Sequence, residues 1–223
     1  MGDRADKQAL FDAFAEVGKA LASGRRAEIV DVLAQGERSV DEVAAELDQS
    51  VANTSHHLRT LARAGLLSSR RDGTRILYRL AGERVAEMWA AVRDVAAEHV
   101  AGIDRLAAAY LGDRSGLETI SRDELVERLD RGDVIVVDVR PPREFAAGHI
   151  PSARSVDPRH LARELSGLPD DADVVAYCRG PYCAYAGDAV RALRRRGIRA
   201  VRLQDGFPEW KRAGLPVAVE QGA

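Results

Sequence analysis

The chain has 223 residues, of which 46% are hydrophobic and 30% are charged, and its formal net charge at pH 7 is −2. These values are typical of a soluble globular protein with room for one large or two ordinary domains, and the small net charge argues against a generic nucleic-acid binder. No apolar run approaches the roughly 18 residues that span a bilayer, and Met1–Leu10 lacks the apolar core of a signal peptide. We therefore expect a cytoplasmic protein with no membrane partner.

The N-terminal half begins with helical patterns. Apolar residues recur with helical spacing over Leu10–Leu21 and Ala27–Leu33, which predicts two helices. Ser39, with Glu42 three residues later, forms a capping box that begins a third helix, and this helix ends near Asp48.

A fourth helix and a hairpin follow. Ser50 is the expected N-cap of a helix that stops at Gly65. Asp72 and Gly73 separate two strand-like runs, which is a strong hairpin signal. Short helices, a tight turn, a longer helix and a basic hairpin together predict a winged helix-turn-helix.

Positive charge is concentrated on the fourth helix and the hairpin. Between His56 and Arg79 there are six arginines and a single acid, Asp72. Local patches of this kind contact phosphates, while amide, imidazole and guanidinium groups on an outward helix face can bond base edges. The alternative is a solvated arginine-rich face. The candidate DNA contacts are Asn53, Ser55, His56, His57 and Arg59 on the helix and Arg70, Arg71 and Arg75 on the hairpin.

The next segment, Glu83 to Leu111, predicts one long helix with a heptad seam. An apolar seam of this length is longer than the core of one small domain requires. We therefore expect a homodimer formed through the 83–111 helix and the N-terminal helix. A protein that binds palindromic half-sites also requires a two-fold dimer. The alternative is a helix packed only on its own domain. A linker is expected at Leu111–Ile120, which divides the chain into domains 1–112 and 113–223.

Beyond the linker, strand and helix patterns alternate. Val134–Val139, Val174–Tyr177 and the shorter Ala200–Leu203 are apolar runs of the kind buried in parallel sheets. Helical patterns separate them. The fold class expected for the whole chain is therefore two-domain, α+β and α/β: a mostly helical winged helix-turn-helix followed by an α/β domain with a central parallel sheet.

Both cysteines of the chain lie in "VVAYCRGPYCAYAGDAV", where Cys178 ends a buried strand and a helix begins near Ala184. The expected anion-binding loop consists of Arg179, Gly180, Pro181, Tyr182 and Ala184, whose backbone N–H groups converge beside the positive end of the helix dipole. We expect this environment to lower the pKa of the Cys178 thiol. The Cys178 thiolate would then attack a sulfane sulfur donor such as thiosulfate and carry a persulfide.

Cys183 has two interpretations. It attacks a Cys178 persulfide, which closes a disulfide and releases sulfide, or it is a small buried apolar residue at the helix start. A zinc clip is not expected, because no other ligand is nearby in sequence. We therefore predict neither a metal nor a cofactor.

The N-terminal half resembles the ArsR/SmtB family of winged-helix repressors in "SHHLRTLARAGLL" followed by "RRDGTRILYRL". The resemblance implies a homodimeric repressor that releases double-stranded operator DNA on binding an inducer. It also assigns the DNA contacts to the residues named above. The chain departs from the metal-sensing members, because "AAELDQSVANTS" has no thiol and the last helix offers His99 alone. We therefore expect His99 to lie in the dimer seam without binding a metal.

The C-terminal half resembles a single rhodanese domain in "VIVVDVRPPREFAAGHIPSARSV", "VVAYCRGPYCAYAGDAVRALRRRG" and "LQDGFPEW". The sixth loop position often holds Arg, Ser or Thr in such domains, whereas here it is Cys183. The resemblance implies supporting roles for Asp138, Arg140, Glu144 and His149 as an ion-pair and hydrogen-bond frame, with His149 as a general base in the alternative. Asp205, Gly206 and Trp210 are expected to wall the pocket or complete the core.

Two functions follow from these features. The first is a transcriptional regulator, expected to be a repressor, whose rhodanese domain senses a small sulfur donor or an oxidant through Cys178 and Cys183. The second is an active sulfurtransferase tethered to DNA. Arsenate reduction is a further alternative, although a six-residue loop from Cys178 to Cys183 favours sulfur over the larger arsenate ion.

Overall fold

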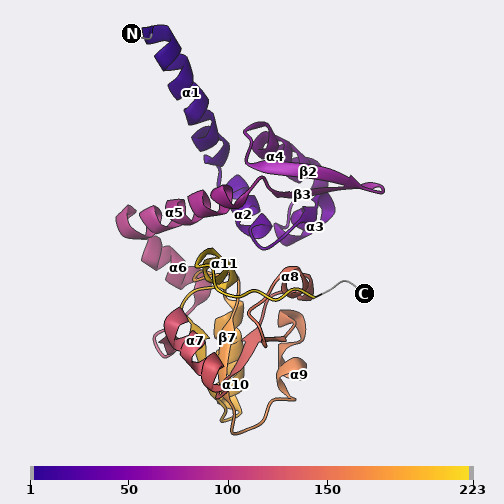
Figure 1. The fold of residues 1–223 in the computed structure, drawn as a ribbon, viewed down its shortest axis with the longest axis vertical. Helices are drawn as coiled ribbons and strands as arrows, with labels where there is room; N and C mark the ends of the chain where they lie inside the picture. Colours follow the sequence, from indigo (N-terminus) through magenta and orange to yellow (C-terminus); the bar gives the residue numbers. More distant parts are fainter. Residues whose placement is uncertain (1–2, 221–223) are drawn as a thin grey trace. The chain divides into compact units, whose positions relative to one another are not determined.

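The structure is a computed structural model that describes residues 3–220. The chain forms two compact units, the first ending at His99 and the second beginning at Val100. The boundary expected from the sequence, between residues 112 and 113, falls inside the second unit. The predicted fold class is confirmed: a winged helix-turn-helix unit is followed by an α/β unit with a parallel sheet (Figure 1).

The first unit is mostly helical and carries a small antiparallel sheet. Its sheet has the order β1-β3-β2, and Asp72 pairs with Arg75 at the hairpin end, as the Asp72-Gly73 turn predicts. The elements are α1 (Arg4–Leu21), α2 (Gly24–Leu33), β1 (Arg38–Ser39), α3 (Val40–Glu46), α4 (Val51–Arg63), β2 (Leu67–Asp72), β3 (Arg75–Leu80) and α5 (Glu83–His99).

The core of the first unit fixes the orientation of α4. Thr54, Leu58 and Leu61 are the buried residues of this helix, and the two leucines pack into a cluster with Ile29 of α2. Val51, which the helical periodicity places on the same face, is 48% exposed instead, because it occupies the first turn beyond the core. The opposite face of α4 is therefore left to solvent.

The predicted single helix from Glu83 to Leu111 is wrong. The structure contains two helices, α5 and α6 (Ile103–Leu111), separated by residues 100–102. Gly102 has a φ of +91°, a left-handed conformation that interrupts an α-helix and that glycine adopts without a Cβ clash. The periodic apolar pattern continues across the break, which is why the sequence does not reveal it.

The second unit is built on a five-stranded parallel sheet with the order β4-β8-β7-β5-β6. The predicted strands and helices are present, together with short elements that the sequence does not reveal. The strands are β4 (Thr119–Ile120), β5 (Ile135–Asp138), β6 (Arg154–Ser155), β7 (Asp173–Tyr177) and β8 (Arg199–Leu203). The remaining helices are α7 (Arg122–Arg131), α8 (Pro142–Ala147), a 3₁₀ turn (Pro158–His160), α9 (Leu161–Leu165), α10 (Tyr185–Arg195) and α11 (Phe207–Arg212).

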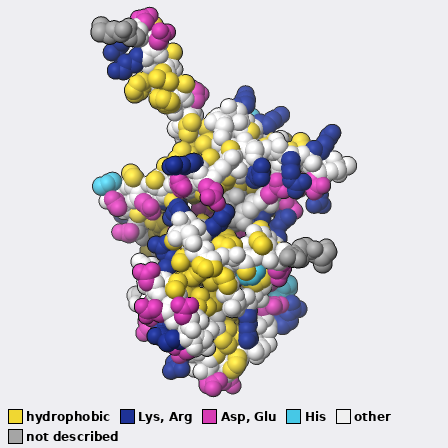
Figure 2. Space-filling view, viewed as in Figure 1, with side chains coloured by type: hydrophobic (Ala, Val, Ile, Leu, Met, Phe, Trp, Pro, Cys, Tyr) yellow, Lys and Arg dark blue, Asp and Glu magenta, His cyan; other side chains and the backbone are white. Residues whose placement is uncertain are grey.

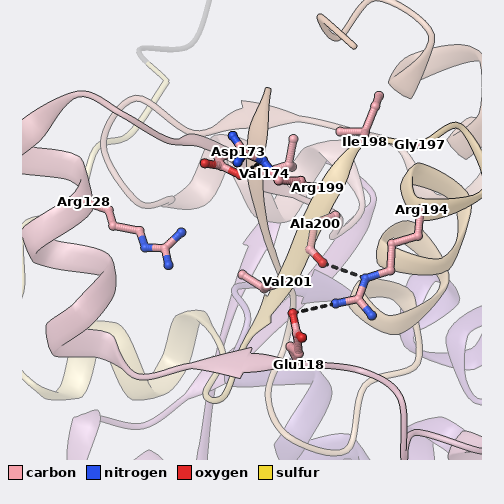
Figure 3. A pocket seen from close by; sticks show the side chains of 10 residues that line it. All are labelled: Glu118, Arg128, Asp173, Val174, Arg194, Gly197, Ile198, Arg199, Ala200 and Val201. Atoms are coloured by element: carbon pink, nitrogen blue, oxygen red, sulfur yellow. Dashed lines mark hydrogen bonds and ion pairs between the residues drawn. The ribbon is translucent and has the colours of Figure 1, made fainter. Parts of the chain in front are cut away.

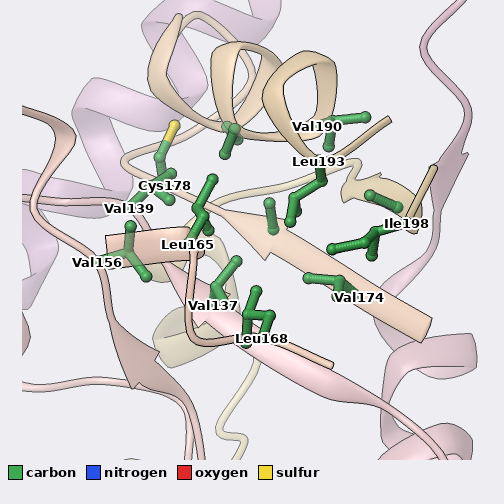
Figure 4. Close-up of a cluster of buried hydrophobic side chains, with 14 residues drawn as sticks. Val137, Val139, Val156, Leu165, Leu168, Val174, Cys178, Val190, Leu193 and Ile198 are labelled. Atoms are coloured by element: carbon green, nitrogen blue, oxygen red, sulfur yellow. The ribbon is translucent and has the colours of Figure 1, made fainter. Parts of the chain in front are cut away.

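Side chains from both faces of this sheet enter separate cores. One core packs Val137 and Val174 against Leu165 of α9 and Leu193 of α10, and Figure 4 shows Cys178 at one end of this cluster. The other includes Leu125 of α7, Tyr177 of β7 and Trp210 of α11. β7 lies in the middle of the sheet, so the residue that follows it emerges between two buried layers.

Within residues 3–220, no helix combines the length and apolar character needed to cross a membrane.

The capping box that begins α3 is confirmed and provides a direct test of the first unit. The Ser39 side chain accepts from the Glu42 backbone N–H at 3.3 Å, and Glu42 accepts from the Ser39 backbone N–H at 2.8 Å. We expect Ser39→Ala to destabilise α3 by about 1 kcal/mol and to speed its amide hydrogen exchange about fivefold. Ser69→Ala, an exposed site on β2, is the control, and equal exchange in both variants would contradict the prediction.

Candidate functional site

The exposed face of α4 carries the side chains expected to contact DNA. Asn53, His56 and Arg59 are exposed, while Ser55 and His57 are half-buried at its edges. Figure 2 shows Lys and Arg side chains gathered along α4 and the β2–β3 hairpin. This surface combines base-reading groups with positive charge, which is the chemistry of a DNA-reading helix and its flanking phosphate contacts.

The surroundings of His57 favour its neutral form. Burial lowers the pKa of its imidazole from the usual value, and the nearby Arg26 guanidinium lowers it further. Its Nδ1 atom is buried without a hydrogen-bond partner. A neutral ring presents one donor and one acceptor, so His57 differs in chemistry from the arginines around it.

The hairpin arginines differ in their surroundings. Arg71 and Arg75 are exposed near the turn. Arg70 is also exposed, but it forms a two-pronged ion pair with Glu37, with 2.6 Å between Nη2 and Oε2. A phosphate contact by Arg70 requires this ion pair to be exchanged for one with DNA.

The cysteine loop connects β7 to α10. Cys178 directly follows Tyr177, the last residue of β7, and its carbonyl accepts from the Phe207 backbone N–H at 2.9 Å. The Cys183 N–H donates to the Gly180 carbonyl at 3.1 Å, which folds the loop into a tight turn before α10 begins. The loop is therefore anchored at its start by the sheet and by α11.

The two thiols interact with each other and differ in their tendency to ionise. Cys178 is buried, 2% exposed, and packs into the apolar core, whereas Cys183 is partly exposed. Burial raises the pKa of Cys178 well above its usual value, with the hydrogen bond to Cys183 adding to the effect. The hydrogen bond from Cys178 lowers the pKa of Cys183 to about 7, helped by the Arg179 and Tyr185 backbone N–H groups. The expectation of a lowered pKa on Cys178 is thus corrected: burial opposes ionisation of Cys178, and the lowered pKa falls on Cys183.

Arg179 joins the loop to α8. It forms a two-pronged ion pair with Glu144, which is fully buried, at 2.7 Å between Nη2 and Oε1. Its charge also contributes to the lowered pKa of Cys183. The Glu144 carboxylate therefore holds the loop cation in a fixed place.

A second buried ion pair lies at the end of β5. Arg140 and Asp138 are both fully buried, with 2.6 Å between Nη2 and Oδ2, and Arg140 also donates to the Gly148 carbonyl at 2.7 Å. His149 stacks on Phe145 at 3.7 Å between ring centroids, and its Nδ1 lies 2.9 Å from the Phe145 carbonyl. Among residues 3–220, no hydrogen bond joins His149 to either cysteine, so the geometry gives no support to a general base.

Two further arginines approach the cysteine loop, and neither belongs to a sequence motif that marks this site. Arg114, from the segment between α6 and β4, donates to the Pro181 carbonyl at 2.8 Å and to the Cys183 carbonyl. Arg202 of β8 also acts electrostatically on both thiols, and burial lowers the pKa of each arginine. No motif marks a cation in an irregular segment, so these contacts depend on the tertiary fold.

Gly206 allows the loop to pack closely against the start of α11. A Cβ at this position would lie 2.2 Å from the Gly180 backbone nitrogen, which no side chain tolerates without displacement of the backbone. The following Trp210 is buried in the core, while Asp205 pairs with Arg122 at 2.7 Å. Tyr182, at the crest of the loop, is 38% exposed.

A separate pocket of about 590 Å³ lies at the opposite end of the sheet (Figure 3). It is lined by residues at the beginnings of β7 and β8 and by side chains around them, including Asp173, Arg194 and Arg199. Cys178 follows the far end of β7, so this pocket does not include the cysteine loop. Across the part of the chain that the structure describes, no group of three or more His, Cys, Asp or Glu side chains could hold a metal ion.

Comparisons with known proteins match both halves. The model of the bacterial regulatory protein arsR family matches residues 23–69, and that of the rhodanese-like domain matches residues 121–213. The HTH-type transcriptional regulator Rv0324 of Mycobacterium tuberculosis is 49% identical over 217 residues, covering 97% of this chain and 94% of the relative. A sulfurtransferase of Allochromatium vinosum is 37% identical over 105 residues, which are 46% of this chain and 96% of that protein.

A solved structure also resembles the N-terminal half. It is the solution structure of the homodimeric winged helix-turn-helix DNA-binding domain of Mb0332 from Mycobacterium bovis, with 48% identity and a TM-score of 0.42. The match covers 45% of this chain and 93% of that one.

The unequal thiols predict a pH-dependent reactivity. We expect iodoacetamide to modify Cys183 first, with a rate that rises as the pH increases through about 7 because the thiolate is the nucleophile. In Cys178→Ala the proton donor is lost, so the midpoint of the rate–pH profile moves to higher pH. Peptide mass spectrometry identifies the modified cysteine, and a profile unchanged by Cys178→Ala would show that Cys178 does not lower the pKa of Cys183.

Because Gly206 lies so close to the cysteine loop, we expect any larger residue at this position to disturb the loop. Gly206→Ala displaces the Gly180 backbone, so we expect the alkylation midpoint of Cys183 to return toward that of an ordinary thiol. Gly167→Ala is the matched control, because a Cβ there meets nothing within 4 Å. A wild-type midpoint in both variants would show that the loop does not depend on this contact.

Proposed function

The chain belongs to the ArsR family of winged helix-turn-helix transcriptional regulators and carries a C-terminal rhodanese domain, and from this premise we propose that it is a dimeric repressor controlled by reactive sulfur. The sensor is the pair Cys178 and Cys183. The observation that carries the proposal is the pair of interacting thiols in one loop, in which Cys183 is partly exposed and Cys178 is buried.

The chemistry uses a small persulfide as donor. A thiolate attacks its sulfane sulfur, takes that sulfur as a protein persulfide and releases the donor as a thiol. The second cysteine then attacks the sulfur bonded to the protein carbon, forms the Cys178–Cys183 disulfide and expels the outer sulfur as hydrosulfide. The exposure and lowered pKa of Cys183 support a first attack by this residue, whereas the loop resemblance favours Cys178; both orders end in the same disulfide.

The DNA-reading surface of α4 and the hairpin supports operator binding, and exposed apolar side chains support the dimer. α1 buries only Ala20 and leaves Leu10, Phe11 and Phe14 more than half exposed, a group of hydrophobic side chains visible in Figure 2. Val92 and Val95 are exposed on α5. Contiguous apolar surface of this kind marks a protein interface, and a two-fold partner would place two copies of α4 on successive half-sites.

An enzymatic function is the second candidate. The intact cysteine loop and the similarity to a sulfurtransferase over nearly its full length favour it. A catalytic sulfurtransferase passes sulfur to an acceptor thiol over many cycles, whereas a sensor stops at the disulfide until it is reduced. The number of sulfur transfers that each protein molecule completes therefore distinguishes the two functions.

The decisive experiment measures operator affinity by fluorescence anisotropy with the full chain. We expect reduced protein to bind DNA from its own upstream region and treatment with a low-molecular-weight persulfide to weaken binding at least tenfold. Cys178→Ser and Cys183→Ser should each bind DNA normally and fail to respond, because neither can form the disulfide. Parallel mass spectrometry follows persulfide and disulfide on each variant.

Two results would count against the sensor. If the protein binds the operator equally tightly with and without the persulfide donor, it has no regulatory response to sulfur. Multiple turnovers of sulfur transfer by the same protein would then favour the tethered enzyme. A normal response in Cys183→Ser would show that the disulfide is not the signal.

A further inference from the structure

An irregular segment of the second unit, between α6 and β4, is fastened along α10 and the cysteine loop. In the segment comprising residues 112–118, Asp113 and Gly116 accept through their carbonyls from Arg191 and Arg194 of α10, at 3.4 and 2.7 Å. Leu117 packs against the apolar core beside α10, where a Cβ on Gly187 would approach it to 3.2 Å. We call residues 112–118 the strap. It lacks regular structure, yet side chains hold it over most of its length.

Arg114 is the strap residue that reaches the cysteine loop. One terminal nitrogen donates to the Pro181 carbonyl at 2.8 Å and the other to the Cys183 carbonyl. Its Nε is buried without a hydrogen-bond partner, so these two bonds are the polar contacts of a half-buried guanidinium. Burial lowers the pKa of Arg114, while a thiolate in the loop favours its cationic form, and Arg114 favours a thiolate in return.

From this geometry we infer that Arg114 is a positioning residue for the dithiol and that it fastens the strap only while Cys178 and Cys183 are reduced. This inference rests on the proposed function for its biological meaning, because it describes how the chemistry at the two sulfurs reaches the segment leading to the DNA reader. No relation in space between the two units enters it.

Disulfide formation acts on both of the attractions that hold Arg114. A disulfide brings the two sulfurs to about 2.05 Å. Cys178 is fixed by the core and by the Phe207 N–H, so the less buried Cys183 makes most of the movement and carries its carbonyl away from Arg114. The same reaction removes the thiolate charge. A half-buried guanidinium that loses one of its two carbonyl acceptors and its nearby anion is more stable in water, so the strap is released.

The test follows amide hydrogen exchange of the strap in the full chain. Two states are compared: protein reduced with dithiothreitol, and protein oxidised with diamide, which takes two electrons and two protons from the thiols. Intact mass confirms the disulfide. We expect the wild-type strap to exchange at least threefold faster in the disulfide state, and Arg114→Gln to exchange at that fast rate in both states.

A pH readout separates positioning from simple support. Arg114→Gln should raise the midpoint of Cys183 alkylation by roughly half to one pH unit because a cation is lost, and Arg114→Lys should restore most of this shift. Arg194→Gln is the matched control: Arg194 also donates to the strap, but its hydrogen bonds go to Gly116, Ala200 and Glu118, outside the cysteine loop. It should loosen the strap in both states and leave the difference between them intact.

The outcomes keep this inference apart from the proposed function. The role of Arg114 would be overturned if the strap of the wild type exchanged its amide hydrogens equally fast in the reduced and disulfide states. It would also be overturned if Arg114→Gln kept the full difference in rate between these states. Both outcomes are independent of DNA binding. In operator titrations, Arg114→Gln should match the oxidised wild type in both states, and a normal donor response in this variant would also overturn it. If the wild-type affinity ignores the disulfide while the strap still loosens, the proposed function fails and the role of Arg114 in the loop stands.

Discussion

The hydrogen bond between the sulfurs of Cys178 and Cys183 is the interaction on which the chemistry of the C-terminal domain depends. A thiol at the end of a buried central strand is surrounded by apolar side chains, and desolvation opposes its ionisation. The same thiol remains a good proton donor. The interaction with Cys178 lowers the pKa of the partly exposed Cys183, so the tendency to ionise lies with the less buried of the two sulfurs.

The surroundings of the loop preserve this geometry with buried charge. Glu144 fixes Arg179, and Asp138 fixes Arg140, in two-pronged pairs whose acidic partners are fully inaccessible to water. Removing one member of such a pair leaves an uncompensated buried charge, which makes both arrangements rigid. Gly206 adds a steric condition, because the loop backbone occupies the space that any larger residue would need.

In the N-terminal unit, a few buried side chains set the orientation of the helix α4. Leu58 and Leu61 hold α4 against α2, so the helix is oriented by its buried face and exposes Asn53, His56 and Arg59. The exposed apolar side chains of α1 and α5 have no comparable cover within the unit. In the proposed dimer this surface is covered, and Arg114 makes the strap responsive to the thiols.

Local patterns in the sequence determined the two-domain fold class, the helix caps at Ser39 and Ser50, the hairpin at Asp72-Gly73, the central strands and the position of the cysteine loop. These features depend on residues close together in the chain, where periodicity and hydrogen-bond chemistry are legible. The break at Gly102 was missed because one glycine does not interrupt the apolar periodicity around it. Which cysteine ionises, which carboxylate fixes Arg179 and that Arg114 reaches the loop were decided only by the tertiary structure. Each depends on burial or on a contact between distant segments, and neither burial nor a contact partner is encoded in the spacing of neighbouring residues.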